Sequence, residues 1–259
     1  ICYFGPCTIY NDYFKKEGII VKNIASAKWR HYFSLQNFID IPKFFWSTLQ
    51  SLWKVYWFMP NVAFSKGGPG ALPVLFACWF YRVPIFIHES DTVPGLTNKI
   101  SGRWAKRVFL GWESARKYFP KKDVEVVGIP LREKLLLEAA KPLNPARGKE
   151  LFSFDINDPV VLVLGGSQGA QKINDFILDN LESFITKFQI LHQVGSVNYE
   201  MHTKSFDQLF GQWPKELKNR YKVFAFFEKN LPEAYAAADV VISRAGASAI
   251  FEIAAFGKP

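Results

Sequence analysis

Cysteine is scarce in this sequence of 259 residues, which contains only Cys2, Cys7 and Cys78. An odd number of cysteines gives no complete set of disulfide bonds, and their spacing matches no metal-binding pattern. This usage excludes a disulfide framework and is typical of a reducing cytosolic compartment. A secretory signal, internal repeats and low-complexity tracts are also absent from the sequence.

The sequence lacks an uninterrupted apolar run of the roughly 20 residues that a membrane-spanning helix needs. Its most apolar stretch, residues 71–87, is interrupted by Arg82 and Pro84. We interpret this stretch as a buried helix followed by a buried strand. The chain begins at Ile1 and stops at Pro259, directly after an expected helix, so we expect it to be an internal piece of a longer protein.

Positive charge is distributed unevenly along the chain. Residues 1–131 contain 17 Lys and Arg and 8 Asp and Glu, whereas residues 132–259 contain 15 of each. The net charge of +9 therefore lies in the first half, where it favours nucleic acid, anionic lipid or a phosphorylated substrate as a partner. A merely solubilising surface is the alternative. Nucleic acid is the weakest of these partners, because no basic–aromatic array lies on one recognition element.

Short apolar runs alternate with helical patterns from end to end. We expect strands near residues 1–4, 19–22, 61–64, 84–88, 105–109, 124–127, 160–164, 189–193, 222–226 and 240–243. In the second half, helices are expected near 170–184, 198–209, 231–237 and 248–256. Strands that are apolar throughout are typical of parallel sheets covered on both faces. The pattern predicts an α/β protein with two Rossmann-like doubly wound domains, residues 1–131 and 132–259, facing a cleft that suits a two-substrate transferase.

The most informative segment runs from a strand through a glycine loop into a helix, residues 160–174. Gly165, Gly166 and Gly169 allow a tight turn with uncovered amide N–H groups, and the positive end of the next helix points at this loop. Such a loop suits a phosphate. Ser167 and Gln168 lie at its tip, where they could bind a diphosphate; an ordinary strand–helix turn is the alternative.

Two common phosphate-binding patterns do not fit this loop. Ala170 and Gln171 stand where a P-loop would have Lys and Ser or Thr. The glycine spacing differs from the dinucleotide fingerprint, and the strand at 189–193 is followed by no acidic ribose ligand. The sequence therefore argues against both an NTPase and a nicotinamide enzyme.

A second strand leads through small residues into a helix at 238–252. Gly246, Ala247 and Ser248 place free amides at the helix N-terminus, and Glu252 lies about one turn further on. Its carboxylate could accept hydrogen bonds from a ribose diol, whereas a mere helix-dipole interaction is the alternative. Arg244 could pair with a phosphate, a base or a surface carboxylate.

The first half contains two further candidate segments. Gly67 and Gly68 belong to a glycine loop that follows an expected strand. His88 and Glu89 end another strand at the edge where doubly wound sheets bind ligands, so either could transfer a proton. Alternatively, both orient the following loop through backbone hydrogen bonds.

Aromatic residues are dense between positions 36 and 58. Ile41, Phe45, Leu49 and Leu52 would form a core stripe on a helix. Trp46, Trp53 and Trp57 exceed that stripe and, with the basic residues Lys28, Arg30, Lys43 and Lys54, indicate an interfacial membrane patch. A thick helix–helix contact is the alternative.

Several motifs together resemble one family over nearly the whole chain. The motifs are Gly165–Ala170 with Asn174, Ser243–Gly246 with Glu252, the run 254–259, His88–Asp91, Pro94–Asn98 and the junction at 127–132. They resemble the MurG family, the UDP-N-acetylglucosamine (UDP-GlcNAc) transferases of peptidoglycan synthesis. The resemblance implies a GT-B fold whose C-terminal domain binds UDP-GlcNAc. It also implies that the N-terminal domain meets lipid I, undecaprenyl-pyrophosphoryl-MurNAc-pentapeptide, at the cytoplasmic face of the plasma membrane.

The resemblance further implies an inverting transfer of GlcNAc to the C4 hydroxyl of MurNAc, giving lipid II, with no obligatory metal or other cofactor. It assigns the diphosphate to Ser167 and Gln168 with Arg132 nearby, and the phosphate and ribose to Ala247, Ser248 and Glu252. The remaining matches are Phe227 beside uracil, Asp91 near the transferred sugar, Gly67 and Gly68 in the acceptor diphosphate loop, and Asn98, Asn174 and Arg244 within the matched motifs.

The sequence departs from the family in four places. The family's first glycine loop, with the His proposed as general base, and its sugar-reading Gln pair fall outside residues 1–259, so we expect this chain not to turn over by itself. Ile129 replaces a usual Asn, and Pro69 a common Tyr. Another membrane-associated GT-B enzyme, such as a diacylglycerol glucosyltransferase, and a non-catalytic nucleotide-sugar-binding scaffold remain alternatives.

Overall fold

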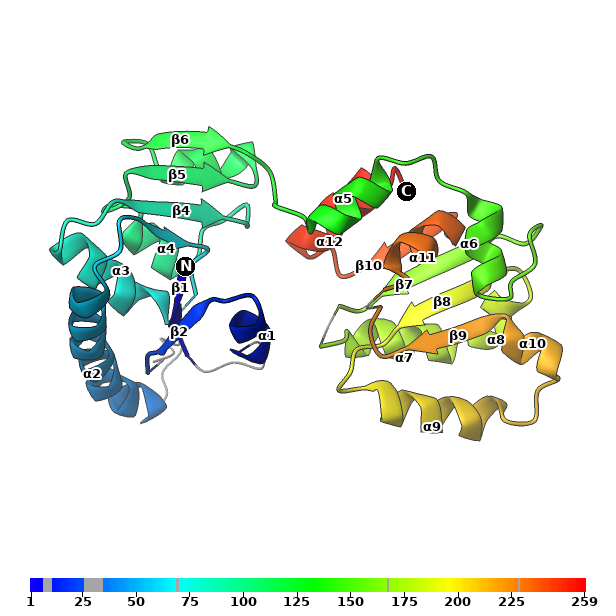
Figure 1. Ribbon diagram of the computed structural model, residues 1–259. Coiled ribbons are helices and arrows are strands. Elements are labelled where there is room, and N and C mark those ends of the chain that lie inside the picture. Colours follow the sequence, from blue (N-terminus) through cyan, green and yellow to red (C-terminus); the bar gives the residue numbers. More distant parts are fainter. Residues whose placement is uncertain (7–10, 26–34, 69, 167, 228) are drawn as a thin grey trace. The chain divides into compact units, whose positions relative to one another are not determined.

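The computed structural model describes residues 1–6, 11–25, 35–68, 70–166, 168–227 and 229–259. The chain forms two compact units, residues 1–129 and 130–259. Each unit has parallel strands with helices between them (Figure 1), which is the expected α/β class. The division between Ile129 and Pro130 lies where Gly and Pro interrupt the periodic pattern of the sequence.

Unit 1 contains two parallel sheets, β1-β2 and β3-β4-β5-β6. Its strands are β1 (Cys2–Gly5), β2 (Ile20–Asn23), β3 (Ala63–Ser65), β4 (Ile85–Glu89), β5 (Arg107–Leu110) and β6 (Asp123–Val126). Its helices are α1 (Asn11–Lys16), α2 (Leu35–Phe58), α3 (Ala71–Phe80), α4 (Leu96–Ser101) and the 3-10 helix η1 (Glu113–Tyr118). One hydrophobic core joins β4 and β5 to α3 and to Val55 of α2.

The apolar stretch at 71–87 forms the expected buried helix and buried strand, α3 and β4. Arg82 and Pro84 lie in the turn between them, and Arg82 has a positive φ of 58°. Among the described residues, no helix combines the length and the apolarity that crossing a bilayer requires.

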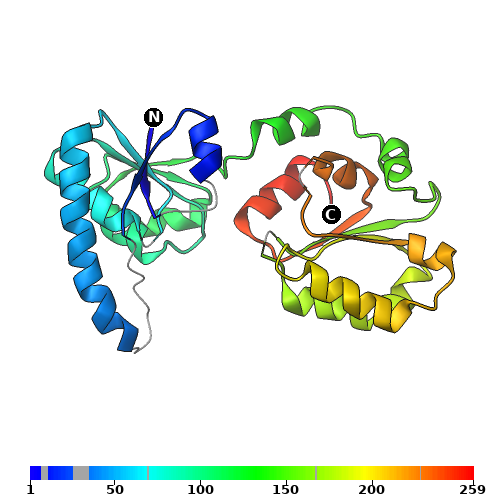
Figure 2. The same ribbon diagram turned by 60° about the horizontal axis from the view of Figure 1, so that its bottom comes forward.

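The predicted core stripe of α2 is confirmed at Leu52, which packs against the core of unit 1, and is wrong at Phe45 and Leu49; the side chain of Ile41 lies outside the described part of the structure. Phe45 and Leu49 are 67% and 60% exposed, and the buried side of the helix carries Ser47, Ser51 and Val55 instead. This face packs on α3, and Figure 2 shows α2 running along the side of unit 1. The aromatic side chains Phe45, Trp46, Trp53 and Trp57 lie on the exposed faces of α2.

Unit 2 has one parallel sheet of four strands in the order β10-β7-β8-β9. The strands are β7 (Val160–Leu164), β8 (Gln189–Gln193), β9 (Tyr221–Phe224) and β10 (Val240–Ser243). The helices are α5 (Glu133–Ala139), α6 (Pro145–Leu151), α7 (Gln171–Asp179), α8 (Leu181–Ile185), α9 (Tyr199–Phe210), α10 (Lys215–Asn219), α11 (Leu231–Ala237) and α12 (Ala247–Ala255). β7, β8 and β10 have the predicted limits.

The sheet of unit 2 is covered on both faces. Leu162 and Leu164 of β7 belong to a core with α5 and α11 on one face, whereas Val163 belongs to a core with α7 and α8 on the other. Both faces of β7 and β8 are therefore covered. This explains why β7 is apolar throughout. The polar side chains of β8 are buried as well.

Candidate functional site

The strand order of unit 2 creates a switch point between β7 and β10. The chain passes from β7 to β8 on one side, while β10 returns to pair with β7 on the other side in parallel register. In doubly wound sheets, ligands bind outside the carboxyl ends of the strands at such a point. Both small-residue loops singled out in the sequence start there.

The first loop, between β7 and α7, depends on its glycines. Gly166 and Gly169 both have φ of 82°, in the left-handed region. A Cβ on Gly169 would lie 2.2 Å from the carbonyl oxygen of Val194, and one on Gly195 would lie 2.2 Å from the Gly169 nitrogen. The loop after β8 thus supports the first loop by direct backbone contact. Gln168 is exposed at the tip, and Ser167 lies outside the described residues.

The second loop, between β10 and α12, has a glycine that the fold itself does not require. Gly246 has an ordinary φ of −62°, and a Cβ there would meet nothing within 4 Å. Its absent side chain leaves open space in front of the α12 amides, which suits a bound phosphate. Ala247 and Ser248 begin this helix, half-buried and exposed respectively.

Arg244 links the two loops. Its Nη1 donates a hydrogen bond to the carbonyl oxygen of Gly169 over 3.3 Å. The side chain is nevertheless exposed, so a guanidinium beside the first glycine loop is open to a ligand. A phosphate, a base and a surface carboxylate were the expected partners of Arg244, and its observed protein partner is the first glycine loop.

Glu252 lies one turn into α12 and is half-buried. Its Oε1 is 3.9 Å from Nη2 of Arg132, and its Oε2 is 3.5 Å from the hydroxyl of Tyr235. Burial raises the pKa of the Glu252 carboxyl, whereas Arg132 and the Tyr235 hydrogen bond lower it. Tyr235 was not identified from the sequence; it is fully buried and stacks on Phe256 with ring centroids 4.5 Å apart.

Two candidate ligand contacts of unit 2 are buried. Asn174 is 1% exposed, donates from Nδ2 to Val194 and faces His192 with Oδ1. Phe227 is 2% exposed, and its side chain packs in the core beside α11. Gln193, which sequence reasoning missed, accepts the Phe227 amide hydrogen bond over 3.0 Å. These side chains shape the loops from beneath.

In unit 1, His88 and Glu89 are engaged with the backbone. Nε2 of His88 lies 2.9 Å from the carbonyl oxygen of Gly128, and the imidazole is 2% exposed. Glu89 accepts hydrogen bonds from the amides of Asp91 and Gly95. This geometry favours the loop-orienting interpretation of both residues over direct proton transfer.

Asn98 connects this segment to the glycine loop of unit 1. Its Nδ2 donates to Glu89 over 2.9 Å, and a Cβ on Gly67 would lie 2.8 Å from its Oδ1. Gly67 and Gly68 have φ of 87° and 99°, and Gly68 is exposed with open space around it. Asp91 is exposed, whereas Pro69 lies outside the described residues.

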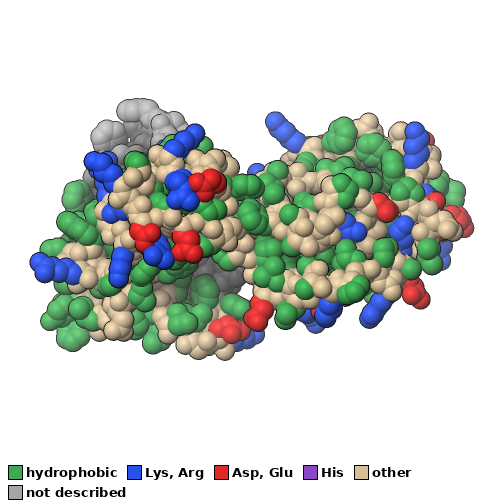
Figure 3. All heavy atoms as spheres, turned by 90° about the horizontal axis from the view of Figure 1, so that it is seen from above, with side chains coloured by type: hydrophobic (Ala, Val, Ile, Leu, Met, Phe, Trp, Pro, Cys, Tyr) green, Lys and Arg blue, Asp and Glu red, His purple; other side chains and the backbone are tan. Residues whose placement is uncertain are grey.

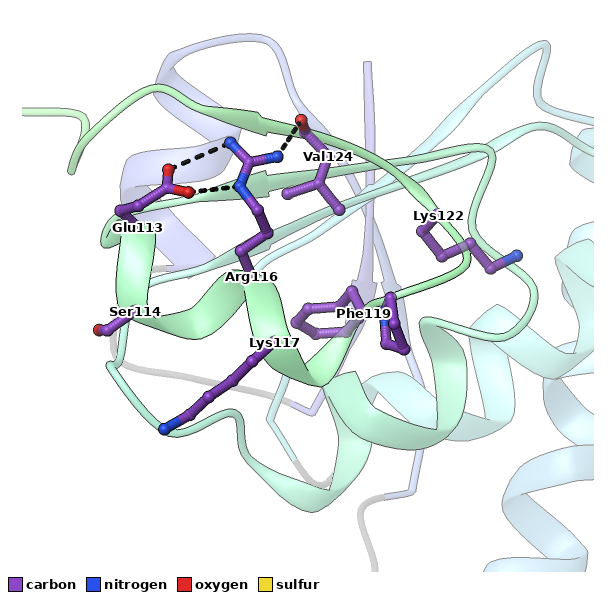
Figure 4. A pocket seen from close by; sticks show the side chains of 8 residues that line it. Glu113, Ser114, Arg116, Lys117, Phe119, Lys122 and Val124 are labelled. Carbon is purple, nitrogen blue, oxygen red and sulfur yellow. Dashed lines mark hydrogen bonds and ion pairs between the residues drawn. The ribbon is translucent and has the colours of Figure 1, made fainter.

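A surface hollow of unit 1 lies beside η1 and β6 (Figure 4), and none of the candidate site residues of unit 1 lines it. Arg116 forms an ion pair with Glu113 and donates to the Val124 carbonyl, and Lys122 donates to two backbone carbonyls. These cations serve the local fold.

On the face seen in Figure 3, basic side chains of unit 1 lie among acidic ones, without forming a patch of one sign. Within the part of the chain that the structure describes, no group of three or more His, Cys, Asp and Glu could hold a metal ion.

Models of two protein domains match the two halves of the chain. Residues 3–110 match the glycosyltransferase family 28 N-terminal domain, and residues 160–259 match its C-terminal domain. The chain belongs to glycosyltransferase family 28. Both loops at the β7–β10 switch point, and Glu252, lie within the part of the chain that matches this family's C-terminal domain.

Curated relatives agree with this family 28 assignment. A Clostridium tetani protein, named UDP-N-acetylglucosamine–N-acetylmuramyl-(pentapeptide) pyrophosphoryl-undecaprenol N-acetylglucosamine transferase, is 37% identical over 95% of this chain and 64% of its own length. A Legionella pneumophila protein of the same name is 37% identical over 91% of this chain and 61% of its own length. The chain therefore spans less than two thirds of these relatives.

The crystal structure of Acinetobacter baumannii MurG aligns with a TM-score of 0.66 at 22% identity, covering 99% of this chain and 67% of that protein. This likeness confirms the expected α/β, GT-B fold.

Proposed function

We propose that this chain is the greater part of an inverting glycosyltransferase that moves GlcNAc from UDP-GlcNAc to the C4 hydroxyl of MurNAc in lipid I, forming lipid II. The observation that carries the proposal is the pair of loops at the β7–β10 switch point, joined by Arg244. The names of the relatives at 37% identity support the choice of substrates.

Unit 2 has the chemistry that the UDP half of the donor needs. Two helix N-termini, a guanidinium and open space at Gly246 suit a diphosphate. The Glu252 carboxylate suits a ribose diol, because it can accept hydrogen bonds from both hydroxyls. As UDP departs, the same loop amides and helix dipoles would stabilise the charge that develops on the leaving diphosphate.

In unit 1, we assign the acceptor side to the Gly67–Gly68 loop and the segment held by Glu89 and Asn98. Glu89 fixes the backbone at Asp91 and Gly95, so the exposed Asp91 side chain has a defined position from which to meet a sugar. His88 and Glu89 themselves would act as positioning residues. Gly68 combines exposure with a backbone that only glycine adopts easily, which suits close approach of a diphosphate.

We also propose that α2 meets the cytoplasmic face of the plasma membrane. Trp46, Trp53 and Trp57 are 61%, 65% and 67% exposed, because the helix packs on α3 through another face. Exposed aromatic residues on one helix favour a lipid interface, and the net charge of the first half favours anionic lipid. Lys28 and Arg30, two of the basic residues named for this patch, lie outside the described residues.

The test of the reaction uses the full-length protein with lipid I and either UDP-GlcNAc or UDP-glucose. We expect lipid II from UDP-GlcNAc and at most slow transfer from UDP-glucose. Preference for UDP-glucose with diacylglycerol as acceptor would identify a lipid glucosyltransferase instead, and binding of UDP-GlcNAc without any transfer would identify a scaffold.

The test of the membrane contact compares the wild-type protein with Trp53→Ser/Trp57→Ser in flotation with vesicles containing phosphatidylglycerol. We expect the double variant to lose most of the bound fraction. Phe176→Ser is the matched control, because Phe176 is 53% exposed on α7 of unit 2. Equal binding by all three proteins would refute the proposed contact.

A further inference from the structure

A chain of buried polar side chains crosses unit 2 beneath the first glycine loop. It begins at His202 in α9 and continues through Tyr221 in β9 and His192 in β8 to Asn174 in α7. Successive distances are 2.7 Å from Nε2 of His202 to the Tyr221 hydroxyl, 2.8 Å on to Nδ1 of His192, and 3.1 Å from its Nε2 to Oδ1 of Asn174. Nδ2 of Asn174 then donates to the Val194 carbonyl over 3.0 Å. These four side chains are at most 6% exposed.

The direction of every hydrogen bond in this row of four side chains follows from the last acceptor, the Val194 carbonyl. A carbonyl oxygen only accepts, so Asn174 must present its NH₂ group to Val194 and its oxygen to His192. That oxygen also only accepts, so His192 must donate through Nε2–H. Burial and the neighbouring His202 lower the pKa of His192 to about 3, so the imidazole is neutral at pH 7 and its Nδ1 accepts from Tyr221. The Tyr221 oxygen then accepts from Nε2–H of His202.

The Val194 carbonyl, where this row of hydrogen bonds ends, lies against the first glycine loop. A Cβ on Gly169 would come within 2.2 Å of that oxygen, so Gly169 rests directly on it. The carbonyl oxygen of Gly169 in turn accepts from Arg244 of the second loop. A shift of the Val194 carbonyl would therefore displace Gly169 and the group that joins the two loops.

We propose that His192 is a positioning residue for the nucleotide diphosphate: its neutral Nε2–H tautomer fixes the Asn174 amide, which fixes the backbone beneath the first glycine loop. The proposal rests on the function proposed above, because it assumes that this loop binds the diphosphate. It also gives Asn174 a role through the backbone, in place of contact with the ligand. An apolar side chain at position 192 would fill the space but leave the Asn174 oxygen without its donor.

The experiment titrates UDP into the full-length protein by calorimetry. His192→Phe should weaken UDP binding about tenfold, the order of effect of one lost buried hydrogen bond. Asn174→Leu should weaken it at least as much, and the double variant should bind no more weakly than Asn174→Leu, because the two residues act as one unit. His192→Gln can still donate an N–H to Asn174 and should recover most of the affinity.

The matched control is Gln189→Leu. Gln189 lies on the same strand, is 2% exposed and makes three hydrogen bonds, to the backbone of Asp155 and Asp158, at the far end of β8 from the loop. Its loss should lower the melting temperature comparably to His192→Phe and leave UDP affinity unchanged. Equal weakening by Gln189→Leu would show that general destabilisation is the cause and would overturn the proposal.

A spectroscopic measurement tests the tautomer directly. In ¹⁵N-labelled wild-type protein, the His192 ring should show a protonated Nε2 and an unprotonated Nδ1 throughout pH 6 to 8. A protonated Nδ1 would overturn the proposal, as would wild-type UDP affinity in folded His192→Phe. If the wild-type protein itself bound no UDP, the function proposed above would fail and this inference with it, an outcome distinct from the others.

Discussion

At the scale of single residues, the candidate site of unit 2 combines exposed side chains, open to a ligand, with buried ones beneath the loops. Gln168, Arg244 and Ser248 are exposed, whereas Asn174 and Phe227 are enclosed. Glu252 is intermediate: its carboxylate is partly desolvated, yet it lies near Arg132 and the Tyr235 hydroxyl. Such a carboxylate can exchange its weak protein contacts for a ribose diol at little cost.

Glu252→Gln should weaken UDP binding about tenfold, because an amide offers one acceptor oxygen in place of two and lacks the charge that strengthens hydrogen bonds from the ribose hydroxyls. Stability should change little, since the substitution removes a partly desolvated charge together with a weak ion pair. Calorimetric titration of UDP measures the effect. Glu200→Gln on the exposed side of α9 is the control, and equal affinities for the two variants would refute the ribose assignment.

The buried His192 should make the stability of the protein depend on pH. Its pKa is about 3 in the folded protein and about 6.5 in the unfolded chain, so protons bind preferentially to the unfolded chain. The free energy of unfolding should be at its full value above pH 6.5 and fall as pH decreases from there towards 3. The loss at pH 5 from this group should be about 2 kcal/mol.

Urea unfolding at pH 5 and pH 8 measures this dependence. His192→Gln should reduce the difference in the free energy of unfolding between pH 5 and pH 8. Part of the difference should remain because of His202, whose pKa is also lowered by burial. Gln189→Leu should keep the full difference. An unchanged pH dependence in His192→Gln would contradict the low pKa of His192 as its cause.

At the scale of elements, two glycines that look alike in sequence have different tasks. Gly169 at the β7–α7 loop has a positive φ and touches the Val194 carbonyl, whereas Gly246 before α12 has neither constraint. The first glycine is required by the backbone, and the second by the space that a ligand would occupy.

Gly169→Ala should therefore destabilise unit 2 by about 2–4 kcal/mol, through left-handed strain and a clash that the backbone must relieve. Gly246→Ala should change stability by less than about 0.5 kcal/mol and still weaken UDP binding, because its methyl group enters the space before the helix amides. Thermal unfolding and UDP titration of both variants check this. Tight UDP binding by Gly246→Ala would place the diphosphate elsewhere.

At the scale of the whole molecule, each unit has its own core. The core of unit 1 involves α2, α3, β4 and β5, and the cores of unit 2 lie on the two faces of its sheet. Seven of the eight tryptophans lie in residues 1–129, and only Trp213 lies in unit 2. Tryptophan fluorescence therefore reports mainly on unit 1, while circular dichroism reports on both units.

UDP should raise the unfolding midpoint of unit 2 and leave that of unit 1 nearly unchanged, since a ligand stabilises the unit that binds it. We expect the melting curve followed by circular dichroism to shift by several degrees at saturating UDP, and the fluorescence curve of Trp213→Phe to stay in place. A shift of equal size in both signals would mean that the two units unfold together.

The order of elements and the two small-residue loops at the β7–β10 switch point could be predicted from the sequence, because both depend on local patterns. β7, β8 and β10 are apolar or enclosed runs of the predicted length, and glycines mark the turns that follow them. Glu252 could be placed one turn into a helix by counting residues. The inward orientation of Asn174 and Phe227 could not, since it depends on which neighbouring strand and loop each side chain meets.

The sequence by itself determined the α/β class, the family and the loops at which a diphosphate would bind, because strand length, glycine position and motif spacing are properties of short segments. Only the tertiary structure decided which face of α2 is buried, since contact with α3 selected Ser47 and Ser51 over the more apolar Phe45 and Leu49. It also decided that Arg244 reaches Gly169 and that His192 holds Asn174. These contacts join residues 75 and 18 positions apart in the chain, so they exist only once the sheet has assembled.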